Sequence, residues 1–429
     1  MPFSSQGLSP AVFSTLPPDV RAALSNAVTA LGYRVATAVQ QQAIPAILQG
    51  RDVLASAQTG SGKTLAYALP LLAQLLSAPA PPASALARQR TLGALVLVPT
   101  RELAVQVGDT LTQLSRPLAR KVKIAVVFGG VSINPQMMNL RRGAHLVVAT
   151  PGRLLDLLAH NAVSLATVGT LVMDEADKLL DLGFGQELTR ILALLPVRRQ
   201  NLFFSATLPP AVQTLAARMM HEPLRIEVAP AEHATPEITQ RAIEVDAQRR
   251  TQLLRHLVQT EKWPRALVFV ATKHAAEIVA DKLRKARIEA EPFHGELSQG
   301  KRTQVLLDFK ASTVQVVVAT DVAARGLDIA QLPVVVNYDL PRSAVDYTHR
   351  IGRTGRAGEA GLAVSFVTAD GAAHFKLIEK RHKMVLAREQ VAGFEPVDVP
   401  ALNLADPEST GGVKGKRPSK KDKRRAATN

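Results

Sequence analysis

Ala57-Gln58-Thr59-Gly60-Ser61-Gly62-Lys63-Thr64 is the stretch that decides the fold of this chain. It follows Asp52–Ser56, which we predict as a short buried strand, and it precedes Leu65–Leu76, which we predict as a helix. A strand, a turn of small residues, a Lys-Thr pair and a helix together are typical of a phosphate-binding loop. In such a loop, backbone N–H groups and the lysine bind phosphate, and the threonine hydroxyl suits Mg2+. Ala57 replaces the glycine of the stricter pattern, so a chance Gly-rich turn is the alternative.

Composition limits the possible classes of protein. With 429 residues, 47% of them hydrophobic, the chain is long enough for two or three domains. It has no Cys, which excludes disulfides, makes a zinc site unexpected and favours the reducing cytoplasm. We expect no signal peptide, because no basic residue precedes Arg21. We also expect no membrane contact, because prolines interrupt the uncharged run Thr64–Ala87 before it reaches the ~20 apolar residues that a span needs.

The charge balance points to a polyanionic partner. There are 52 Lys and Arg against 36 Asp and Glu, a net charge of +16. Such an excess favours binding to nucleic acid, with a role in solubility as the alternative. Lys414–Arg425 alone holds eight Lys and Arg and one acid, so we predict a disordered tail that captures nucleic acid through its phosphates.

Elsewhere, apolar strands alternate with helical stretches, which indicates an α/β fold of parallel sheets covered on both faces. Predicted strands in the first half are 94–98, 124–127, 146–149, 170–173 and 202–205. The alternation pauses near 229–236 and resumes with strands at 266–270, 314–319, 334–337 and 362–367. We therefore predict a first domain over 1–228, a linker over 229–240, a second domain over 241–390 and a basic tail over 391–429.

Carboxylates follow the predicted strand at 170–173, in the sequence Asp174-Glu175-Ala176-Asp177. A carboxylate at the end of a neighbouring strand is where a P-loop NTPase holds Mg2+. Glu175 can also orient and deprotonate the attacking water. We therefore predict Thr64, Asp174 and Glu175 at the metal. The alternative is an acidic helix N-terminus that the helix dipole favours.

Short motifs follow one another along both halves of the chain. In the first half they are Gln40, Ala57–Thr64, Pro99–Ala104, Gly129-Gly130, Thr150–Arg153, Asp174–Asp177 and Ser205-Ala206-Thr207. In the second half they are His294-Gly295, Gln299, Arg302, Ala319-Thr320-Asp321, Ala324–Asp328 and His349–Arg356. Their order resembles that of the DEAD-box ATP-dependent RNA helicases of superfamily 2. The resemblance covers about residues 20–390 and implies two RecA-like domains that close on ATP and single-stranded RNA. Gly130–Gln136 and Gly393–Pro396 are similar to the bacterial RhlE-type branch.

The resemblance also implies an ATP site. Gln40 would read adenine, because an amide offers both a donor and an acceptor, although it has two neighbouring glutamines and could be an ordinary surface residue. Phe3 or Phe13 would stack on the base. Arg353 and Arg356 would be arginine fingers supplied by the second domain. The remaining residues that the resemblance assigns to ATP are Ala57, Gln58, Thr59, Gly60, Ser61, Gly62, Lys63, Thr64 and Asp328, and those that couple the sites are Asp177, Ser205, Thr207 and His349.

An RNA surface follows from the same resemblance. Small residues and hydroxyls suit contacts to phosphates and 2′-hydroxyls, and only 4% of the residues are aromatic, so we expect little base specificity. The implied residues are Pro99, Thr100, Arg101, Gly129, Gly130, Thr150, Gly152 and Arg153 in the first half and His294, Gly295, Arg302 and Thr320 in the second.

The sequence therefore predicts a cytoplasmic, monomeric, Mg2+-dependent ATPase that RNA stimulates and that separates short RNA duplexes or remodels ribonucleoproteins. Complexes for ribosome assembly or RNA decay are expected partners. One alternative is an ATP-gated RNA clamp or assembly platform with little unwinding. Another is a processive DNA translocase, against which the Asp-Glu-Ala-Asp sequence and Gln40 argue.

Overall fold

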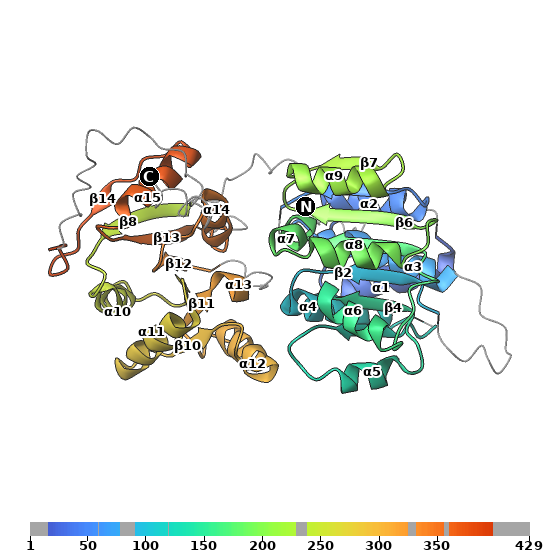
Figure 1. Ribbon diagram of the computed structural model, residues 1–429, viewed down its shortest axis with the longest axis horizontal. Coiled ribbons are helices and arrows are strands. Elements are labelled where there is room, and N and C mark those ends of the chain that lie inside the picture. Colours follow the sequence, from blue (N-terminus) through green and yellow to red (C-terminus); the bar gives the residue numbers. More distant parts are fainter. Residues whose placement is uncertain are drawn as a thin grey trace, which may run out of the picture.

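The computed structural model describes residues 16–58, 60–77, 91–118, 120–228, 238–324, 332–355 and 360–397. Two α/β bodies lie side by side in it, each built on one parallel sheet (Figure 1). Several predictions fall on positions outside the described residues, namely those for Phe3, Phe13, Thr59, Asp328, Arg356 and Lys414–Arg425.

The first sheet has seven parallel strands in the order β3-β4-β2-β5-β6-β1-β7. Alternate side chains enter two separate cores, one on each face. Val147 and Ala149 of β4, for example, face the opposite core from Leu146 and Val148. The strands are β1 Val53–Ser56, β2 Ala94–Leu97, β3 Ile124–Val127, β4 Leu146–Ala149, β5 Thr170–Asp174, β6 Gln200–Ser205 and β7 Leu224–Glu227.

Nine helices of the described chain cover this sheet. One face packs against α1 Pro18–Ala30, α2 Ala38–Leu48, α3 Lys63–Ser77 and α4 Arg101–Ser115. The other face packs against α5 Asn134–Leu140, α6 Pro151–Ala159, α7 Ala176–Asp181, α8 Gly185–Ala193 and α9 Pro210–Met219. Because most helices follow a strand directly, their N-termini gather at the carboxyl edge of the sheet, where the strands end.

The second sheet repeats this plan, with the strand order β10-β11-β9-β12-β13-β8-β14. Its strands are β8 Ile238–Glu244, β9 Ala266–Val270, β10 Ala290–Phe293, β11 Val316–Thr320, β12 Val334–Asn337, β13 Gly361–Val367 and β14 Arg388–Glu389. One face packs against α10 Arg250–Thr260 and α11 Lys273–Lys285. The other packs against α12 Gln299–Lys310, α13 Asp321–Ala324, α14 Ala344–Ile351 and α15 Ala372–His382. The predicted α/β class with two parallel sheets is confirmed.

The structure differs from the predicted boundaries at two places. Strand β8 begins at Ile238, inside the stretch that we predicted as linker. Residues 391–397, which we assigned to the tail, pack against the second half. The Phe394 ring packs against His256, and the Val397 N–H donates to Asp246. Partial burial of Phe394 and this hydrogen bond hold a segment whose composition is typical of a disordered tail.

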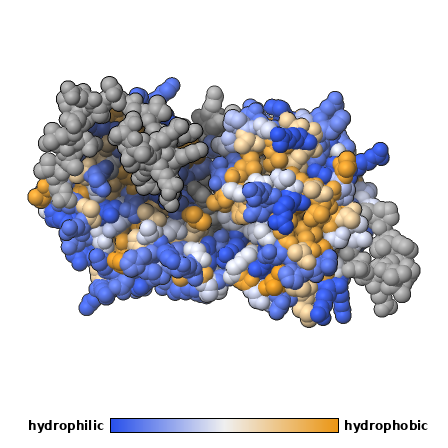
Figure 2. Space-filling view, in the orientation of Figure 1, coloured by the Kyte–Doolittle hydropathy of each residue, from blue (hydrophilic) through white to orange (hydrophobic). Residues whose placement is uncertain are grey.

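Surface character differs between the two halves. Hydrophobic residues gather on the visible face of the first half, whereas that of the second is mainly hydrophilic (Figure 2). Leu194 and Val197, which follow α8, are 53% and 96% exposed. Among the described helices, none has both the length and the apolar character needed to cross a membrane.

Candidate ATP and RNA site

The strand order divides the carboxyl edge of the first sheet into two parts. The phosphate-binding loop follows β1, Asp174-Glu175 ends β5, and Ser205 ends β6, and these three strands are neighbours. The predicted RNA residues follow β2, β3 and β4, which are also neighbours. Topology therefore gathers the two predicted sets of residues on adjacent parts of one edge, as expected for a crevice outside the carboxyl ends of parallel strands.

The phosphate-binding loop has the backbone that its sequence predicts. Gly60 and Gly62 have φ values of 87° and 88°, in the left-handed region that glycine tolerates best. Helix α3 begins at Lys63, so the free N–H groups of its first turn point into the loop. The Lys63 ammonium is buried and donates to the carbonyl of Ala57, and burial lowers its pKa. Ser61 Oγ is buried without a hydrogen-bond partner among the described residues, and a phosphate oxygen would satisfy it.

Gln40 connects the start of α2 to this loop. Its Oε1 accepts from the Thr37 backbone N–H at 3.0 Å, and its Nε2 donates to the Gly62 carbonyl at 3.1 Å. The side chain is only 3% exposed, so Gln40 is not the ordinary surface residue that the sequence left open. Its contact with Gly62 means that Gln40 can act on the loop as well as on a base.

Replacing Gln40 should separate these two roles. If Gln40 reads adenine, Gln40→Ala should lower ATP affinity about tenfold and leave GTP affinity unchanged, because a neutral hydrogen bond contributes about 0.5–1.5 kcal/mol. If it only braces Gly62, both nucleotides should weaken equally. Equilibrium titration with fluorescent ATP and GTP analogues measures this ratio. The exposed Gln42, changed to Ala, is the matched control.

Asp174 and Glu175 form the acidic part of the site, and partners hold both carboxylates. Asp174 Oδ2 accepts from the Tyr67 hydroxyl at 2.8 Å, and its Oδ1 accepts from the Glu175 N–H at 2.9 Å. Burial and the nearby Glu175 charge raise the pKa of Asp174 to about 6, although Lys63 opposes the shift. Glu175 Oε1 accepts from Lys178 Nζ at 2.7 Å, whereas its buried Oε2 has no partner among the described residues.

These carboxylates fit a hard cation such as Mg2+, which takes oxygen ligands. The raised pKa of Asp174 and the unsatisfied Glu175 oxygen are the features that a cation would relieve. No group of three or more His, Cys, Asp or Glu side chains in the described chain could hold a metal by itself. Mg2+ usually keeps several waters and binds through one or two carboxylates plus substrate phosphates, which matches this sparse set.

Asp177 joins two strand ends within the first half. Its N–H donates to Ser205 Oγ at 3.2 Å, and its Oδ2 accepts from both the N–H and the hydroxyl of Thr207, at 3.0 and 2.8 Å. All three were predicted as coupling residues, and the structure brings them together. A shift of Asp177 would therefore move the end of β6 together with α7.

Residues of the predicted RNA surface in the first half also contact one another. The guanidinium of Arg101 packs directly on Gly130, whose φ is 76°, so a Cβ there would displace the end of the Arg101 side chain. Arg153 donates to the Val131 carbonyl at 2.7 Å and is only 8% exposed, while two of its guanidinium nitrogens lack hydrogen-bond partners in the described chain. Thr100 caps α4. Pro99, Gly129, Thr150 and Gly152 lie in the same loops or at the helix starts.

In the second half the corresponding residues follow β10 and β11, which are neighbours. His294 and Gly295 follow β10, and Thr320 ends β11. His294 Nε2 lies 2.7 Å from Glu277 Oε1, and its Nδ1 is buried without a partner among the described atoms. Arg302, from α12, donates to the His294 carbonyl at 3.0 Å and stacks over Phe293.

The two halves approach each other on both parts of the edge. Arg302 donates to Glu102 of α4 through Nε at 2.8 Å, and both side chains are less than a tenth exposed. On the ATP side, a cleft of about 350 Å³ lies between Lys178 and Asp181 of α7 and Asp346 and His349 of α14. Burial, and then the Lys178 charge, lower the pKa of His349. The predicted RNA surfaces of the two halves thus face each other at α4 and α12, and the ATP sides of the two halves face each other at α7 and α14.

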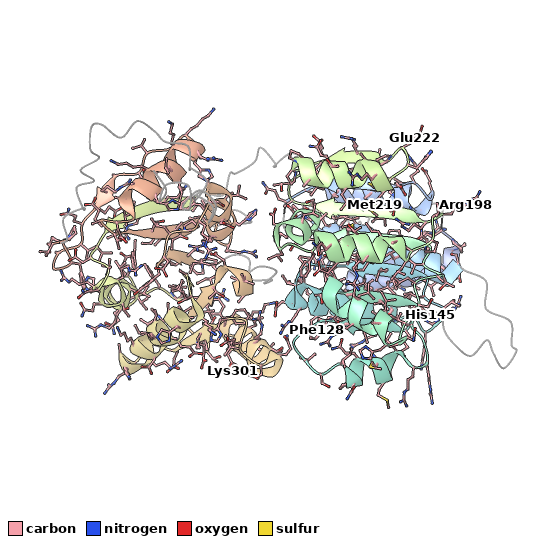
Figure 3. All side chains as sticks on the ribbon, viewed as in Figure 1. Phe128, His145, Arg198, Met219, Glu222 and Lys301 are labelled. Atoms are coloured by element: carbon pink, nitrogen blue, oxygen red, sulfur yellow. The ribbon has the colours of Figure 1, made fainter. Side chains whose placement is uncertain are left out.

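The Glu102–Arg302 pair gives a measurable expectation. Arg302→Ala should weaken RNA binding in the presence of a non-hydrolysable ATP analogue about 10–100-fold, because it leaves a buried carboxylate unpaired. Combining it with Glu102→Gln should add little if Arg302 acts by joining the halves, and should add fully if Arg302 contacts RNA instead. Lys301→Ala on the same helix removes an exposed pair with Glu291 and should change little (Figure 3).

Several residues in these contacts, among them Tyr67, Lys178 and Glu102, were not predicted from sequence. Tyr67 lies one helical turn after Lys63, which was the available signal for a partner of Asp174. Lys178 directly follows Asp177, within hydrogen-bonding reach of Glu175 along a helix. Glu102 lies inside the Pro99–Ala104 motif, but its partner is 200 residues away in the chain. That contact depends on how the two halves meet.

A loop with the backbone of a phosphate-binding loop, a carboxylate on a neighbouring strand and a second parallel sheet beside the first are the features of a two-domain P-loop ATPase. Two family models match the chain: DEAD/DEAH box helicase over residues 37–215 and the helicase conserved C-terminal domain over 249–358. The chain belongs to the family of DEAD-box ATP-dependent RNA helicases. As a member of this family it is an ATP hydrolase and an RNA helicase.

Curated relatives extend over most of the chain. DEAD-box ATP-dependent RNA helicase CshA of Bacillus cereus is 38% identical over 382 residues, which cover 89% of this chain and 69% of that protein. ATP-dependent rRNA helicase rrp3 of Sclerotinia sclerotiorum is 40% identical over 380 residues, covering 87% and 76%. These relatives are not named as RhlE proteins, so placement in the RhlE-type branch stays a hypothesis.

Solved structures with bound RNA are similar over both halves. Saccharomyces cerevisiae Dbp5 bound to RNA and ADP BeF3 has a TM-score of 0.74 at 28% identity, covering 90% of this chain and 96% of that one. Mss116p bound to ssRNA and AMP-PNP has a TM-score of 0.75 at 29% identity, covering 89% and 79%. One half superimposed alone could not give such scores, because it holds only about half of the residues. The halves are therefore arranged much as in these complexes.

Proposed function

We propose that this protein hydrolyses Mg2+-bound ATP under the control of RNA and uses the cycle to separate short RNA duplexes. The observation that carries the proposal is that the carboxyl edges of the two sheets face each other, ATP part to ATP part and RNA part to RNA part. The ATP parts of the two sheets meet at α7 and α14, and the RNA parts meet at Glu102 and Arg302. One movement of the halves would therefore complete both sites, so each ligand favours the state that binds the other.

Each residue then has a defined task at the nucleotide. The loop from Ala57 to Thr64 would bind the phosphates, and Lys63 would contact the β- and γ-phosphates. Thr64 and Asp174 would hold Mg2+, which supplies charge neutralisation at the phosphates. Glu175 Oε2 would accept a proton from the attacking water, because Lys178 already occupies Oε1 and fixes the carboxylate.

RNA would bind along its backbone. Arg101, Gly130 and Arg153 from the first half and His294, Gly295 and Thr320 from the second lie at neighbouring strand ends and suit phosphates and 2′-hydroxyls. Closure would bend the bound strand so that it no longer fits an A-form partner. We further propose a monomer that works in the cytoplasm, which the absence of cysteine supports, with ribonucleoprotein, ribosome-assembly or RNA-decay complexes as its setting.

Two assays test this function together. ATP hydrolysis should increase with single-stranded or duplex RNA and not with DNA of the same sequence. A duplex short enough to dissociate after local opening should be separated only when ATP is present. ATP-dependent retention of RNA without any strand separation would contradict the unwinding proposal, as would equal stimulation by DNA.

A further inference from the structure

The amino edge of the first sheet, opposite the ATP site, carries a basic surface with no role in the proposed function. Residues 110–155 contain seven Lys and Arg and no Asp or Glu. Six of the seven lie in the two loops that enter β3 and β4. We call them the basic edge: Arg116, Arg120, Lys121, Lys123, Arg141 and Arg142.

The two loops form one surface. The His145 N–H donates to the Lys123 carbonyl at 2.9 Å, and the Lys123 N–H donates back to His145 Nδ1 at 2.8 Å. Arg116, Lys121, Arg141 and Arg142 are all exposed. His145 lies at the end of the first half that faces away from the second half (Figure 3). Phe128, at the other end of these strands, lies on the side toward the second half.

Helix capping accounts for part of this charge. Arg116 and Arg141 directly follow α4 and α5, and a helix C-terminus favours a cation. Arg120 donates to the Leu75 carbonyl in the last turn of α3, and Lys123 donates to the Asn139 carbonyl in the last turn of α5, so both also serve helix C-termini. Capping does not explain Lys121, which is exposed and belongs to no helix end. A solubility charge would not need to avoid acidic residues over 46 successive positions. The pattern fits a polyanion better.

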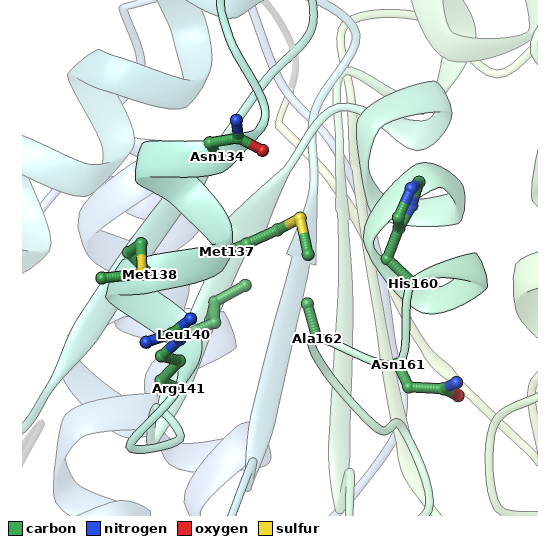
Figure 4. Close-up of a pocket in the computed structure, with 8 residues that line it drawn as sticks. All are labelled: Asn134, Met137, Met138, Leu140, Arg141, His160, Asn161 and Ala162. Carbon is green, nitrogen blue, oxygen red and sulfur yellow. The ribbon is translucent and has the colours of Figure 1, made fainter.

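A groove begins at the basic edge and runs beside α5, the helix that follows the Gly129-Gly130 loop. It lies between α5 and the end of α6 and has a volume of about 570 Å³ (Figure 4). Asn134, at the start of α5, and Arg141, a member of the basic edge, both line this groove. Gln136 of α5 hydrogen-bonds both the N–H and the carbonyl of Phe128, which fixes the helix beside Gly129-Gly130. Helix α5 has seven residues and is about 10 Å long, so the groove is short enough for a few nucleotides.

The lining of the groove suits single-stranded RNA. Asn134 and Asn161 offer amides that can pair with base edges, and the His160 ring and the Met137 thioether offer surfaces for a base. In Figure 4, Met137 reaches from α5 across the groove toward Ala162. Met138 is 56% exposed beside it. An acidic peptide would match the basic edge but not the amides.

We propose that RNA flanking the stretch in the cleft runs along this groove and is held by its phosphates at the basic edge. The inference rests on the proposed RNA path past Gly129-Gly130 and adds a second contact area on the same strand. It makes affinity depend on RNA length and salt, without changing the chemistry at the ATP site.

Charge removal on the full-length chain tests the inference. The variant Arg116→Gln/Lys121→Gln/Arg141→Gln is compared with the control Lys282→Gln/Lys376→Gln/Lys380→Gln, which removes three exposed charges from the second half. Affinity for oligouridines of about 10 and about 25 nucleotides is measured between about 50 and 200 mM salt with a non-hydrolysable ATP analogue. Since each single-strand phosphate contact contributes about 0.7 to the log–log salt slope, the basic-edge variant should lower the slope by about 2 for the longer RNA alone.

Lowering salt from about 200 to 50 mM increases affinity for the longer RNA, and this increase should be about 20-fold smaller in the basic-edge variant than in the unmodified protein. The control should show no change. Met137→Glu should lose the tighter binding of the longer RNA over the shorter one, whereas Met137→Leu should keep it. An unchanged slope in the basic-edge variant, or an equal decrease in the control, would overturn the inference. ATPase activity with the 10-nucleotide RNA distinguishes failure of this inference from failure of the proposed function. If the short RNA stimulates ATPase and the salt slope of the basic-edge variant does not change, only this inference fails.

Discussion

Glu175→Gln should slow RNA-stimulated ATP hydrolysis by about 10²–10⁴-fold and leave ATP affinity nearly intact, because it removes a general base without removing a phosphate contact. Glutamine keeps the shape of the side chain, but it cannot take a proton from water. The variant should also retain RNA, since the closed complex forms but turns over slowly. Single-turnover hydrolysis and equilibrium nucleotide titration, done on the same preparation, give the two quantities.

Lys63→Ala is the companion variant. It removes a charged contact to phosphate, so it should weaken ATP binding itself. The role of Glu175 would be wrong if Glu175→Gln lost ATP affinity as severely as Lys63→Ala. Circular dichroism melting should accompany both variants, because Glu175 and Lys63 are buried and Glu175 has a φ of 50°, a conformation uncommon for a residue with a side chain.

The sequence was informative wherever a short segment determines its own conformation. Gly60 and Gly62, with the Lys-Thr pair that follows them, predicted a loop and helix that the structure contains almost residue for residue. The central strands were also predicted, because burial on both faces gives a continuous apolar run. Residues at the ends of those strands then had to meet, since parallel strands end at one edge.

Several strands at or next to the sheet edges were missed for a physical reason, although the apolar edge strand β3 was predicted. β10 contains Pro292, β7 alternates with the exposed Arg225 and Glu227, and β8 carries polar residues along its first half. An edge strand is buried less completely and tolerates Pro and charge, so its sequence resembles a loop. Partner choice was missed for another reason: no local pattern states that Tyr67 meets Asp174 or that Arg302 meets Glu102.

The turn that carries Arg353 is held firmly in the second half. Thr354 is fully buried and hydrogen-bonds the carbonyls of Leu332 and Pro333, and the Leu332 N–H donates to the Arg353 carbonyl at 3.1 Å. Arg350 clamps the preceding helix through two hydrogen bonds to Asp321, at 2.6 and 2.7 Å. The backbone at Arg353 is thus preorganised, on the same helix end as His349, whose pKa responds to charges from both halves.

Arg353→Ala in the full chain should therefore lower RNA-stimulated hydrolysis by about 10³–10⁵-fold, which is the effect of an arginine that stabilises charge on a transferring phosphoryl group. ATP affinity without RNA should change little, because the open protein would bind nucleotide mainly through its first half. The exposed Arg381, changed to Ala, removes the same charge elsewhere in the second half and should keep full activity. Single-turnover rates at saturating RNA measure both.

A fragment of residues 1–228 tests the same finger without any substitution. It contains all seven strands of the first sheet and both cores that cover it, so it should fold and bind ATP. It lacks Arg353 and every partner of α7 from the second half, so its hydrolysis should stay at the unstimulated level whatever the RNA concentration. Full RNA-stimulated turnover by this fragment would show that no group from the second half is needed, and the coupling of hydrolysis to closure would fail with it.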